Sequence, residues 1–558
     1  MKIYKADKTI SIPRDQNLTE LLHSSAYPTL PESHLIAKDN LTNRSITIGE
    51  LRERAGRIAK GLHDEFRPVD QARWAVVLPN SVEYLEIFQA VLWTGGVACP
   101  INYALRPAEI GHALAVSKPH FVVVYGPTAS ALLEGVDLAT KDLAEAGIKW
   151  QRPAIVTMIS RAAGFKHIPD DFYGADRLPV PHYVDTSKRL ASIHLSSGTT
   201  GKPKGVELTH LNFIANCHQL VAHDPKQFGP DSKTIAFTPW AHIAGTTAPL
   251  FLGPYCGMLH HAMPQYSLEK LGELAGSDHA TNFQGPPSVV LALANSDVTS
   301  RYDFSHARTI MVGGAPLKKD LVDRLLGRAP WRLRQVYGMT EAAGYVAYQK
   351  LDEELPDGVV GKLLPNIEAR LVKEGSTEDV AVGEAGELWL RGPNITRGYA
   401  FDKEATGKAF PVPGWYNTGD VCKIDDQGRI SVVGRTKELI KYKGFQVAPA
   451  ELESYLNSHP HVAEGGVAAT WDESQLTELP TAWVVLKDHI KGESETRKAL
   501  VDIHQSIDEK VSGYKKLRGG VWHVPALPKN PTGKILRKVM AEMRQGLSSL
   551  EHKITSKL

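Results

Sequence analysis

The sequence predicts an α/β protein in two parts: a large N-terminal domain of parallel-rich sheets covered by helices, and a small α+β domain behind it. The length of 558 residues exceeds what one hydrophobic core usually serves, so at least two domains are expected. Strand and helix patterns alternate through most of the chain. This alternation of strand and helix patterns changes after about residue 435, where the small domain is expected to begin.

The first strand–helix unit illustrates the evidence for the large domain. The run "RWAVVLP" at 73–79 is almost entirely apolar, as in a buried strand. Asn80 or Ser81 can cap the helix that follows, because both residue types are favoured at that position. Gly95 then ends the helix before the strand-like "VACPIN". Apolar residues lie at helical spacing between these limits, at Val82, Leu85, Phe88 and Leu92.

The same alternation continues along the chain. The stretch 308–327, "RTIMVGGAPLKKDLVDRLLG", is a second strand–loop–helix unit, in which Gly313 and Gly314 end the strand and Gly327 follows the helix. Such alternation predicts parallel sheets covered by helices, with ligands at the carboxyl ends of the strands. Further strand candidates lie at 120–126, 153–159, 192–196 and 234–239.

The small domain has a different pattern. "ELIKYKGFQV" at 438–447 predicts a hairpin that turns at Lys443 and Gly444, and "PAELESYLNSH" predicts a short helix from Pro449. The segments "AEGGVAATW" and "TAWVVLKD" supply further strands. Together they form an α+β unit of about 120 residues, which is within the usual size range of a domain.

Composition argues against several classes of protein. Hydrophobic residues at 42% and charged residues at 23% are typical of a globular protein. The net charge of +2 gives no electrostatic footprint for nucleic acid. The four cysteines lie far apart without CxxC spacing, so neither a zinc site nor a disulfide framework is expected. The absence of a run of 18 apolar residues predicts no membrane span.

The last three residues, Ser556-Lys557-Leu558, form the tripeptide SKL, an address that is read by the peroxisomal import receptor. A polar tail would end in this way by chance on the order of once in thousands of sequences. The sequence therefore predicts a peroxisomal location.

The stretch 195–205, "LSSGTTGKPKG", combines glycines, hydroxyl side chains and lysines. It is not a Walker A loop, which needs a different glycine spacing and an immediate helix, whereas here a strand-like "VELTH" follows. Its amides and hydroxyls can wrap the β- and γ-phosphates of a nucleotide, with Lys202 or Lys204 neutralising charge. Taken alone, the pattern fits a flexible surface loop equally well.

Four further motifs follow in order. "YGMTEAAG" at 337–344 places Thr340, suited to a phosphate, beside Glu341, suited to Mg²⁺, at the end of a strand. "GWYNTGD" at 414–420 ends in an acid that can accept hydrogen bonds from ribose hydroxyls. The last two are "GRTKELIKYKGFQVAP" at 434–449 and "PKNPTGKILRK" at 528–538. With these motifs the chain resembles the adenylate-forming enzymes, and most of all 4-coumarate–CoA ligase, over roughly residues 20 to 545.

The resemblance implies a two-step reaction. MgATP would activate a small carboxylic acid to an acyl-adenylate and pyrophosphate, and the acyl group would pass to the thiol of CoA. ATP, Mg²⁺ and CoA are therefore the expected cofactors. By the same resemblance, Tyr337 stacks on adenine, Thr340 contacts the α-phosphate, Glu341 coordinates Mg²⁺, and Asp420 and Arg435 hold the ribose. The pyrophosphate would be held by Ser196, Ser197, Gly198, Thr199, Thr200, Gly201, Lys202 and Lys204, and the adenine and acyl pocket would be bordered by Gly313, Gly314, Ala315 and Pro316.

The small domain is mobile in this resemblance. It implies a domain at 1–434, a hinge at 435–437 that includes Lys437, and a second domain at 438–558. Lys534 would reach the α-phosphate and the substrate carboxylate, where two anions meet, although most lysines are solvated surface residues.

Other catalytic and binding roles follow from the same comparison. Lys441 and Gln446 match positions that contact the adenylate, and Lys443 and Gly444 match a segment that lines the CoA tunnel. A plain surface hairpin is the alternative for Lys443 and Gly444. His242 matches a ring that gates the acyl pocket, whereas a lone histidine is more often structural.

Two departures concern the acyl pocket. Plant coumarate ligases carry a tyrosine where this chain has Ala244, and a Gly-Pro-Val run near 343–346, where this chain reads Ala-Gly-Tyr-Val. These differences favour an arylacetic or a medium-chain acid over a hydroxycinnamate. Two other functions share these motifs: a luciferase-like monooxygenase, and a stand-alone adenylation enzyme that loads a carrier protein.

Overall fold

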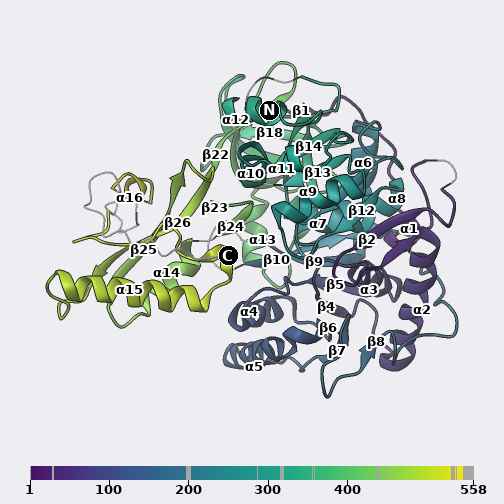
Figure 1. The fold of residues 1–558 in the computed structure, drawn as a ribbon, viewed down its shortest axis with the longest axis horizontal. Coiled ribbons are helices and arrows are strands. Elements are labelled where there is room, and N and C mark those ends of the chain that lie inside the picture. The colour runs from purple at the N-terminus through teal and green to yellow at the C-terminus, as the bar shows by residue number, and fades with distance from the viewer. Residues whose placement is uncertain are drawn as a thin grey trace. The chain divides into compact units, whose positions relative to one another are not determined.

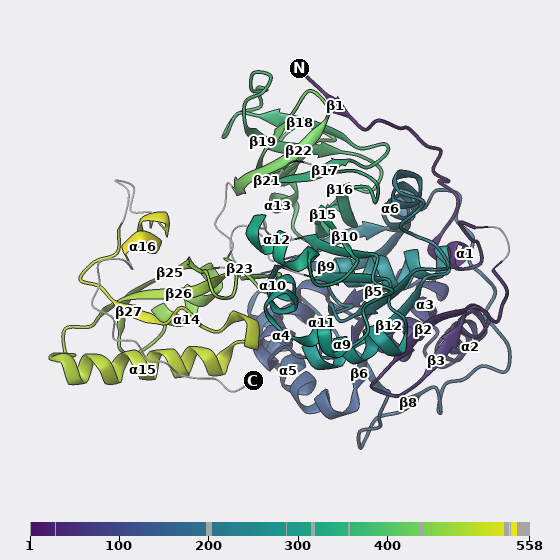
Figure 2. The same ribbon diagram turned by 45° about the horizontal axis from the view of Figure 1, so that its top comes forward.

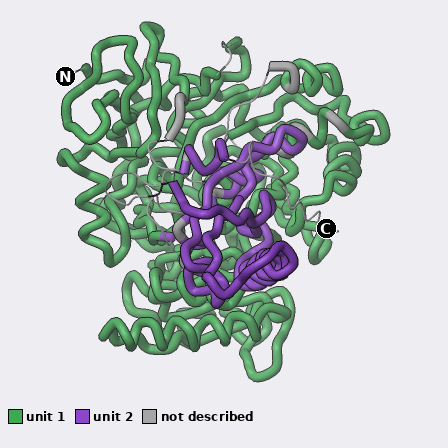
Figure 3. Tube along the Cα trace, turned by 90° about the vertical axis from the view of Figure 1, so that its left-hand side faces the viewer, with its two compact units in different colours: residues 1–196, 204–434 green, residues 197–203, 435–558 purple. Residues whose placement is uncertain are grey.

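The computed structural model describes residues 2–27, 30–196, 203–285, 287–313, 319–354, 356, 358–435, 440–447, 449–528, 535 and 537–543. Two compact units divide it: residues 1–196 and 204–434 belong to the first, and residues 197–203 and 435–558 belong to the second (Figure 3). The mixed α/β architecture with a large and a small unit confirms the predicted fold class. Among the described helices, none combines the length and apolarity needed to cross a membrane.

One sheet of the large unit is mostly parallel. Its order is β20-β10-β9-β5-β4-β6-β7-β8, with parallel pairing from β9 to β8 and antiparallel pairing among β9, β10 and β20. The helices α4 (Pro107–Ser117) and α5 (Ala129–Glu145) lie side by side and cover it (Figure 1). The strands are β4 (Arg73–Val77), β5 (Val97–Pro100), β6 (Phe121–Tyr125), β7 (Ala154–Met158), β8 (His167–Ile168), β9 (Leu190–Ser196), β10 (Lys204–Thr209) and β20 (Gly398–Tyr399).

The second sheet of this unit is mixed. Its order among the described residues is β1-β18-β19-β21-β22-β17-β16-β15-β14-β13-β11-β12-β2-β3. Pairing is parallel from β2 to β15, and antiparallel from β15 to β22 and from β21 to β18. The parallel half contains β2 (Leu35–Asp39), β12 (Leu259–Ala262), β11 (Lys233–Ala236), β13 (Asn282–Gly285), β14 (Thr309–Gly313) and β15 (Arg332–Met339). The remaining strands are β1 (Tyr4–Lys5), β3 (Ser45–Thr47), β16 (Gly344–Tyr348), β17 (Val359–Leu363), β18 (Glu368–Val372), β19 (Gly386–Arg391), β21 (Tyr416–Ile424) and β22 (Arg429–Arg435).

The helix after β4 shows why the predicted elements form. α3 (Val82–Trp93) begins at Ser81, whose hydroxyl accepts a hydrogen bond of 3.1 Å from the Tyr84 amide. Every residue of α3 is buried, including its two acids, Glu83 and Glu86. Its two acids are compatible with burial because Arg44 pairs with both Glu83 and Glu86.

The other helices of the large unit are short or amphipathic. They are α1 (Leu18–Leu22), α2 (Ile48–Phe66), α6 (His210–His223), α7 (Ile243–Thr246), a π-helical turn (Thr247–Leu252), α8 (Gly253–Cys256), α9 (Leu268–Ser277), α10 (Pro287–Asn295), α11 (Val298–Arg301), α12 (Lys319–Leu326) and α13 (Lys403–Ala409). The predicted start of α12 near Pro316 lies outside the described residues.

The small unit has a hydrophobic core of its own. The hairpin of β23 (Ile440–Tyr442) and β24 (Phe445–Val447) turns at Lys443 and Gly444, as predicted. The sheet of β25 (Val462–Asp472), β26 (Thr477–Leu486) and β27 (Val521–His523) packs against α15 (Glu493–Lys510), which runs along it (Figure 2). Val467, Ile503 and Ile507 belong to this core, and α14 (Pro449–Asn457) and α16 (Arg537–Met543) complete the unit.

Candidate functional site

The Thr-Glu motif follows directly on the end of β15, as predicted, in a tightly restrained turn. Gly338 faces the next strand so closely that a Cβ atom would lie 1.8 Å from the Gly344 carbonyl oxygen, and therefore only glycine fits. Thr340 opens a single 3₁₀ turn, and Ala343 ends it in the left-handed region at φ 53°.

Side chains from three other elements hold this turn. The Asn394 amide donates to the Ala342 carbonyl at 3.0 Å, and the Thr247 hydroxyl donates to the Ala343 carbonyl at 2.7 Å. The Asn216 side chain bonds both backbone groups of Tyr345, at 3.1 and 2.8 Å. The backbone that carries Glu341 is thus fixed before any ligand binds.

The Glu341 carboxylate lies where the two sheets of the large unit meet. Ser196, the last residue of β9, donates its hydroxyl to Oε1 at 2.8 Å, and Tyr399 of β20 donates to the same atom at 3.1 Å. The residue is 8% exposed, and within the described part of the chain no lysine or arginine lies within 4.0 Å of its carboxylate. Both of these hydrogen-bond donors are neutral, and the carboxylate retains its capacity for a cation.

This carboxylate fits a hard divalent cation. No cluster of three or more histidine, cysteine or acidic side chains that could bind a metal occurs among the described residues. A cation at Glu341 would therefore complete its coordination with water and substrate oxygens, which is the usual manner of Mg²⁺ beside phosphates.

Tyr399, which donates to the Glu341 carboxylate, also contacts Lys204. The Lys204 Nζ is 5.1 Å from the centre of the Tyr399 ring, within the range of a cation–π contact. Burial, and next the charge of Glu341, raise the pKa of Tyr399, so its hydroxyl remains a donor. Tyr399 was missed by the sequence analysis, because only the pairing of β20 with β10 brings it here.

Tyr337 and Asp420, predicted to hold adenine and ribose, are brought together. The Tyr337 hydroxyl donates to the Asp420 carboxylate at 2.7 Å, and Asp420 is 2% exposed. Burial and the Asp420 charge raise the pKa of Tyr337, so this donor is not lost at neutral pH. The pair links the end of β15 to β21.

His242 caps the first turn of α7. Its Nδ1 accepts a hydrogen bond of 3.4 Å from the Ala244 amide. Solvent reaches the ring, but the surrounding protein desolvates it and lowers its pKa.

A second histidine, which the sequence analysis missed, lies buried near His242. His194 sits between the Ser192 and Thr246 hydroxyls, each 2.8 Å away. Burial, and then the proximity of His242, lower its pKa to about 3, so it is neutral. Because the Thr246 hydroxyl donates to the Trp240 carbonyl at 2.7 Å, it accepts from the His194 ring, which ties the last residue of α7 to β9.

A small cavity of about 20 Å³ lies beside α7. Ala244, His260 and Gln284 are among its lining residues. The Gln284 amide donates to the Tyr345 hydroxyl at 3.1 Å. Positions 244 and 345, where this chain differs from plant coumarate ligases, therefore both lie close to one cavity. Tyr345 itself is buried.

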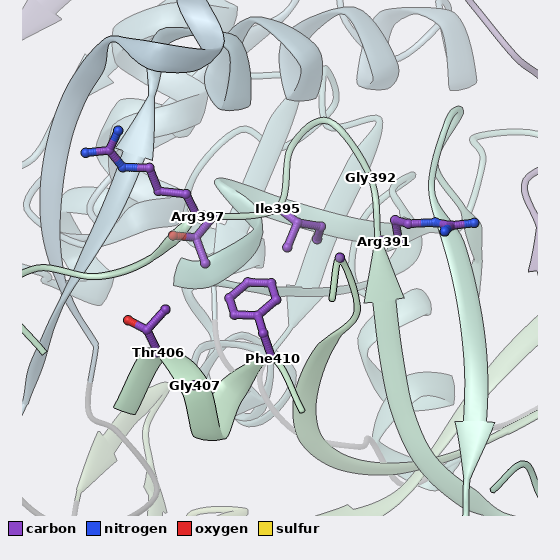
Figure 4. Close-up of a pocket in the computed structure, with 9 residues that line it drawn as sticks. Arg391, Gly392, Ile395, Arg397, Thr406, Gly407 and Phe410 are labelled. Atoms are coloured by element: carbon purple, nitrogen blue, oxygen red, sulfur yellow. The ribbon is translucent and has the colours of Figure 1, made fainter. Parts of the chain in front are cut away.

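A larger cavity, of about 530 Å³, contains none of the predicted site residues. It lies between α13 and the segment after β19, and the Phe410 ring lines it, pointing toward Ile395 (Figure 4). Arg391 and Arg397 line it, but their guanidinium groups point in opposite directions and pair with Glu368 and Glu207. We therefore assign no ligand to this cavity.

In the small unit, the predicted hairpin residues are held against β26. The Lys443 amide donates to the Thr477 hydroxyl at 2.7 Å, which donates to the Lys441 carbonyl at 2.9 Å. Gln446 pairs with Lys441 across the hairpin. Gln446 and Arg435 are described for their backbone only. The predicted residues Ser197, Gly198, Thr199, Thr200, Gly201, Lys202, Gly314, Ala315, Lys437 and Lys534 lie outside the described residues.

Comparison with known proteins identifies the family. The sequence matches the description "AMP-binding enzyme" over residues 30–400 and "AMP-binding enzyme C-terminal domain" over residues 451–534. The chain belongs to the AMP-binding enzyme family.

Individual relatives and solved structures are consistent with this family assignment. A probable 4-coumarate–CoA ligase 2 of Dictyostelium discoideum is 31% identical over 94% of this chain and 98% of its own. The 4-coumarate–CoA ligase 2 of Nicotiana tabacum is 32% identical over 94% and 95%. Among solved structures, a malonyl-CoA ligase ternary product complex with methylmalonyl-CoA and AMP bound is similar with a TM-score of 0.72 and 25% identity, over 91% of this chain and 99% of that one.

These matches confirm the family, fold class and enzyme class predicted from the motifs. As a member of the AMP-binding enzyme family, the chain is an AMP-forming acid–thiol ligase. ATP and CoA are substrates of this family. The individual residue roles, the hinge at 435–437 and the peroxisomal address remain predictions.

Proposed function

We propose that this protein activates a small carboxylic acid with MgATP to an acyl-adenylate and pyrophosphate, and then transfers the acyl group to free CoA. The observation that carries the proposal is the Glu341 carboxylate, held by Ser196 and Tyr399 with no ion-pair partner among the described residues. Tyr337, four residues before Glu341, and its hydrogen-bond partner Asp420 supply an aromatic ring and a carboxylate for a nucleoside. Relatives named as CoA ligases support CoA as the acceptor.

The first step joins two anions, the substrate carboxylate and the α-phosphate. Glu341 would hold Mg²⁺, which supplies positive charge to the phosphates when bound. Thr340 would donate to the α-phosphate, and Asp420 would accept from the ribose hydroxyls. Lys534 would add a second positive charge between the reacting groups. His242, neutral because its pKa is lowered, would then give way to the incoming thiol.

The acid is proposed to be an arylacetic or a medium-chain acid. Ala244 leaves space where plant coumarate ligases have a tyrosine, while Tyr345 and Gln284 place a hydroxyl and an amide near the cavity. Since the cavity holds only about 20 Å³, the acyl group requires a shift of the α7 segment or of Tyr345. The terminal SKL supports a peroxisomal setting, in β-oxidation or secondary metabolism.

Pyrophosphate release, measured with and without CoA across a panel of carboxylic acids, tests this function. We expect AMP, pyrophosphate and an acyl-CoA thioester, with the highest kcat/KM among arylacetic or medium-chain acids. The appearance of ADP and phosphate would exclude adenylate formation. Light emission with oxygen and a luciferin would favour a monooxygenase, and transfer to a carrier protein but not to CoA would favour a carrier-loading enzyme.

A further inference from the structure

One face of strand β9 carries three polar side chains. Ser192, His194 and Ser196 alternate along the strand and therefore point to the same side of the sheet. All three are buried. Ser196 donates its hydroxyl to the Glu341 carboxylate, whereas His194 bonds the last residue of α7. The same strand face thus contacts both the proposed metal site and the segment that begins at His242.

The hydrogen bonds through His194 have a fixed direction. The Thr246 hydroxyl gives its single hydrogen to the Trp240 carbonyl at 2.7 Å, so it accepts from His194 Nε2 at 2.8 Å. Burial, and next the proximity of His242, lower the pKa of His194 to about 3, and the neutral ring has only one N–H. Its Nδ1 therefore accepts from the Ser192 hydroxyl, also at 2.8 Å. Each hydrogen in this chain of bonds has one position.

The backbone that carries His242 is held firmly. The Thr246 amide donates to the His242 carbonyl at 2.9 Å, and the Thr246 hydroxyl lies 3.3 Å from the same oxygen. The His242 amide donates to the Pro239 carbonyl at 2.9 Å. Gly245 packs so closely on this carbonyl that an added Cβ atom would lie 2.2 Å from its oxygen. His194 joins this compact turn to the sheet through Thr246.

The His242 ring, by contrast, is held loosely. Solvent reaches it, and its hydrogen bond with the Ala244 amide measures 3.4 Å, longer than the usual range for such bonds. The ring can therefore change its rotamer while the backbone stays in place. A side chain that swings from a fixed backbone is the arrangement that a gate requires.

The Glu341 site has supports of its own. The carboxylate accepts hydrogen bonds from Ser196 and Tyr399, and Asn394 holds the backbone of the turn. None of these bonds passes through His194. Loss of the His194 bond to α7 should therefore disturb the gate but leave the groups that form the adenylate in place.

We propose that His194 is a positioning residue for the second half-reaction: by donating to Thr246 it fixes the backbone from which the His242 ring swings when the thiol enters. It acts through Thr246 and not on the reacting atoms. The proposal rests on the proposed function, in which His242 gives way to the thiol.

Two substitutions separate the two nitrogens of the His194 ring. Glutamine places its amide nitrogen near the position of Nε2 and can still donate to Thr246, whereas the shorter asparagine can keep only the bond with Ser192. His194→Asn should slow thioester formation from preformed acyl-adenylate and CoA by about tenfold, the size expected for one hydrogen bond. Pyrophosphate release from acid and MgATP should stay within about twofold of the wild-type rate. His194→Gln should restore most of the transfer rate.

His223→Asn is the matched control. His223 is also buried, and its Nε2 bonds the Tyr348 carbonyl at 3.0 Å, a contact that asparagine would lose in the same way. We expect a lower melting temperature but an unchanged ratio of the two half-reaction rates. Both rates are measured on one preparation, so a change in the fraction of folded enzyme cancels in the ratio.

If His194→Asn cannot be purified, Thr246→Val and Thr246→Ser test the same bond from its other side. Valine removes the hydroxyl and should slow the transfer step selectively, whereas serine keeps the hydroxyl and should not. Equal slowing of both half-reactions, or equal transfer rates in the asparagine and glutamine variants, would overturn the positioning role. Failure of the wild type to release pyrophosphate with any acid of the panel would instead overturn the proposed function.

Discussion

Replacing Tyr399 with phenylalanine tests whether Glu341 is the group that holds the metal. The substitution removes only the hydroxyl that donates to Glu341 Oε1 at 3.1 Å. The ring that faces Lys204 is retained, and the Ser196 hydroxyl still donates to the same oxygen at 2.8 Å. The carboxylate keeps its charge but loses one of the two side-chain donors that orient it.

The size of the effect follows from this geometry. A hydrogen bond to a charged group contributes about 1.5–3 kcal/mol, which corresponds to roughly 10- to 150-fold in an equilibrium constant. Because this bond is the longer of the two and the Ser196 hydroxyl still donates to the same oxygen, we expect a change of about tenfold. The change should appear in the Mg²⁺ concentration that gives half-maximal adenylate formation.

The assay is pyrophosphate release at saturating acid and ATP, with Mg²⁺ varied. Tyr103→Phe, which removes a hydroxyl that donates to the Pro264 carbonyl at 3.4 Å, is the control and should leave the Mg²⁺ dependence unchanged. Ser196→Ala combined with Tyr399→Phe should raise the Mg²⁺ concentration for half-maximal adenylate formation further than either change alone. If Tyr399→Phe lowers the melting temperature without altering the Mg²⁺ requirement, Glu341 does not hold the metal.

Three other predictions concern the domain movement, the cellular address and the pH dependence of stability. Lys534→Ala should slow adenylate formation by about a hundredfold or more but leave thioester formation from preformed acyl-adenylate near the wild-type rate, and Lys437→Pro should do the reverse because proline opposes the hinge movement. Equal damage to both steps by Lys534→Ala would remove its step-specific role. Deleting residues 556–558 should leave an active enzyme in the cytosol, and import of the truncated protein, followed by fluorescence microscopy, would require another signal. Burial lowers the pKa of His194 and His210 from 6.5 to about 3, so unfolding takes up protons below pH 6.5. Stability should therefore be full above pH 6.5 and fall toward pH 3, by up to about 1.4 kcal/mol per pH unit for each histidine. In urea unfolding between pH 7 and 5, His210→Gln should reduce this slope, and an unaltered slope would contradict the assignment.

Local patterns predicted much of the fold. The unit of β4, Ser81 and α3 follows from an apolar run, a capping hydroxyl and helical spacing within twenty residues or so. The Lys443–Gly444 turn and the placement of Thr340 and Glu341 after a strand were likewise visible, because each depends on a few adjacent residues.

Long-range pairing was not predictable in this way. Tyr399 reaches Glu341 only because the two-residue strand β20 pairs with β10, nearly 200 positions earlier. His194 gave no signal, since its role depends on Thr246 of a distant helix. The antiparallel half of the mixed sheet was missed because strands such as β16 are buried on both faces and show no alternation.

The side-chain hydrogen bonds that hold the backbone of residues 342–345 also affect the thermodynamics of nucleotide binding. Fixing the backbone of one residue costs about 1–2 kcal/mol of conformational entropy. Asn216, Thr247 and Asn394 already immobilise these residues in the folded protein. The backbone entropy is therefore lost during folding, and its loss does not reduce the free energy of nucleotide binding. Binding at Glu341 should therefore have a smaller entropic penalty than binding to a loop that orders on contact, and nucleotide affinity there should weaken only gradually as the temperature rises.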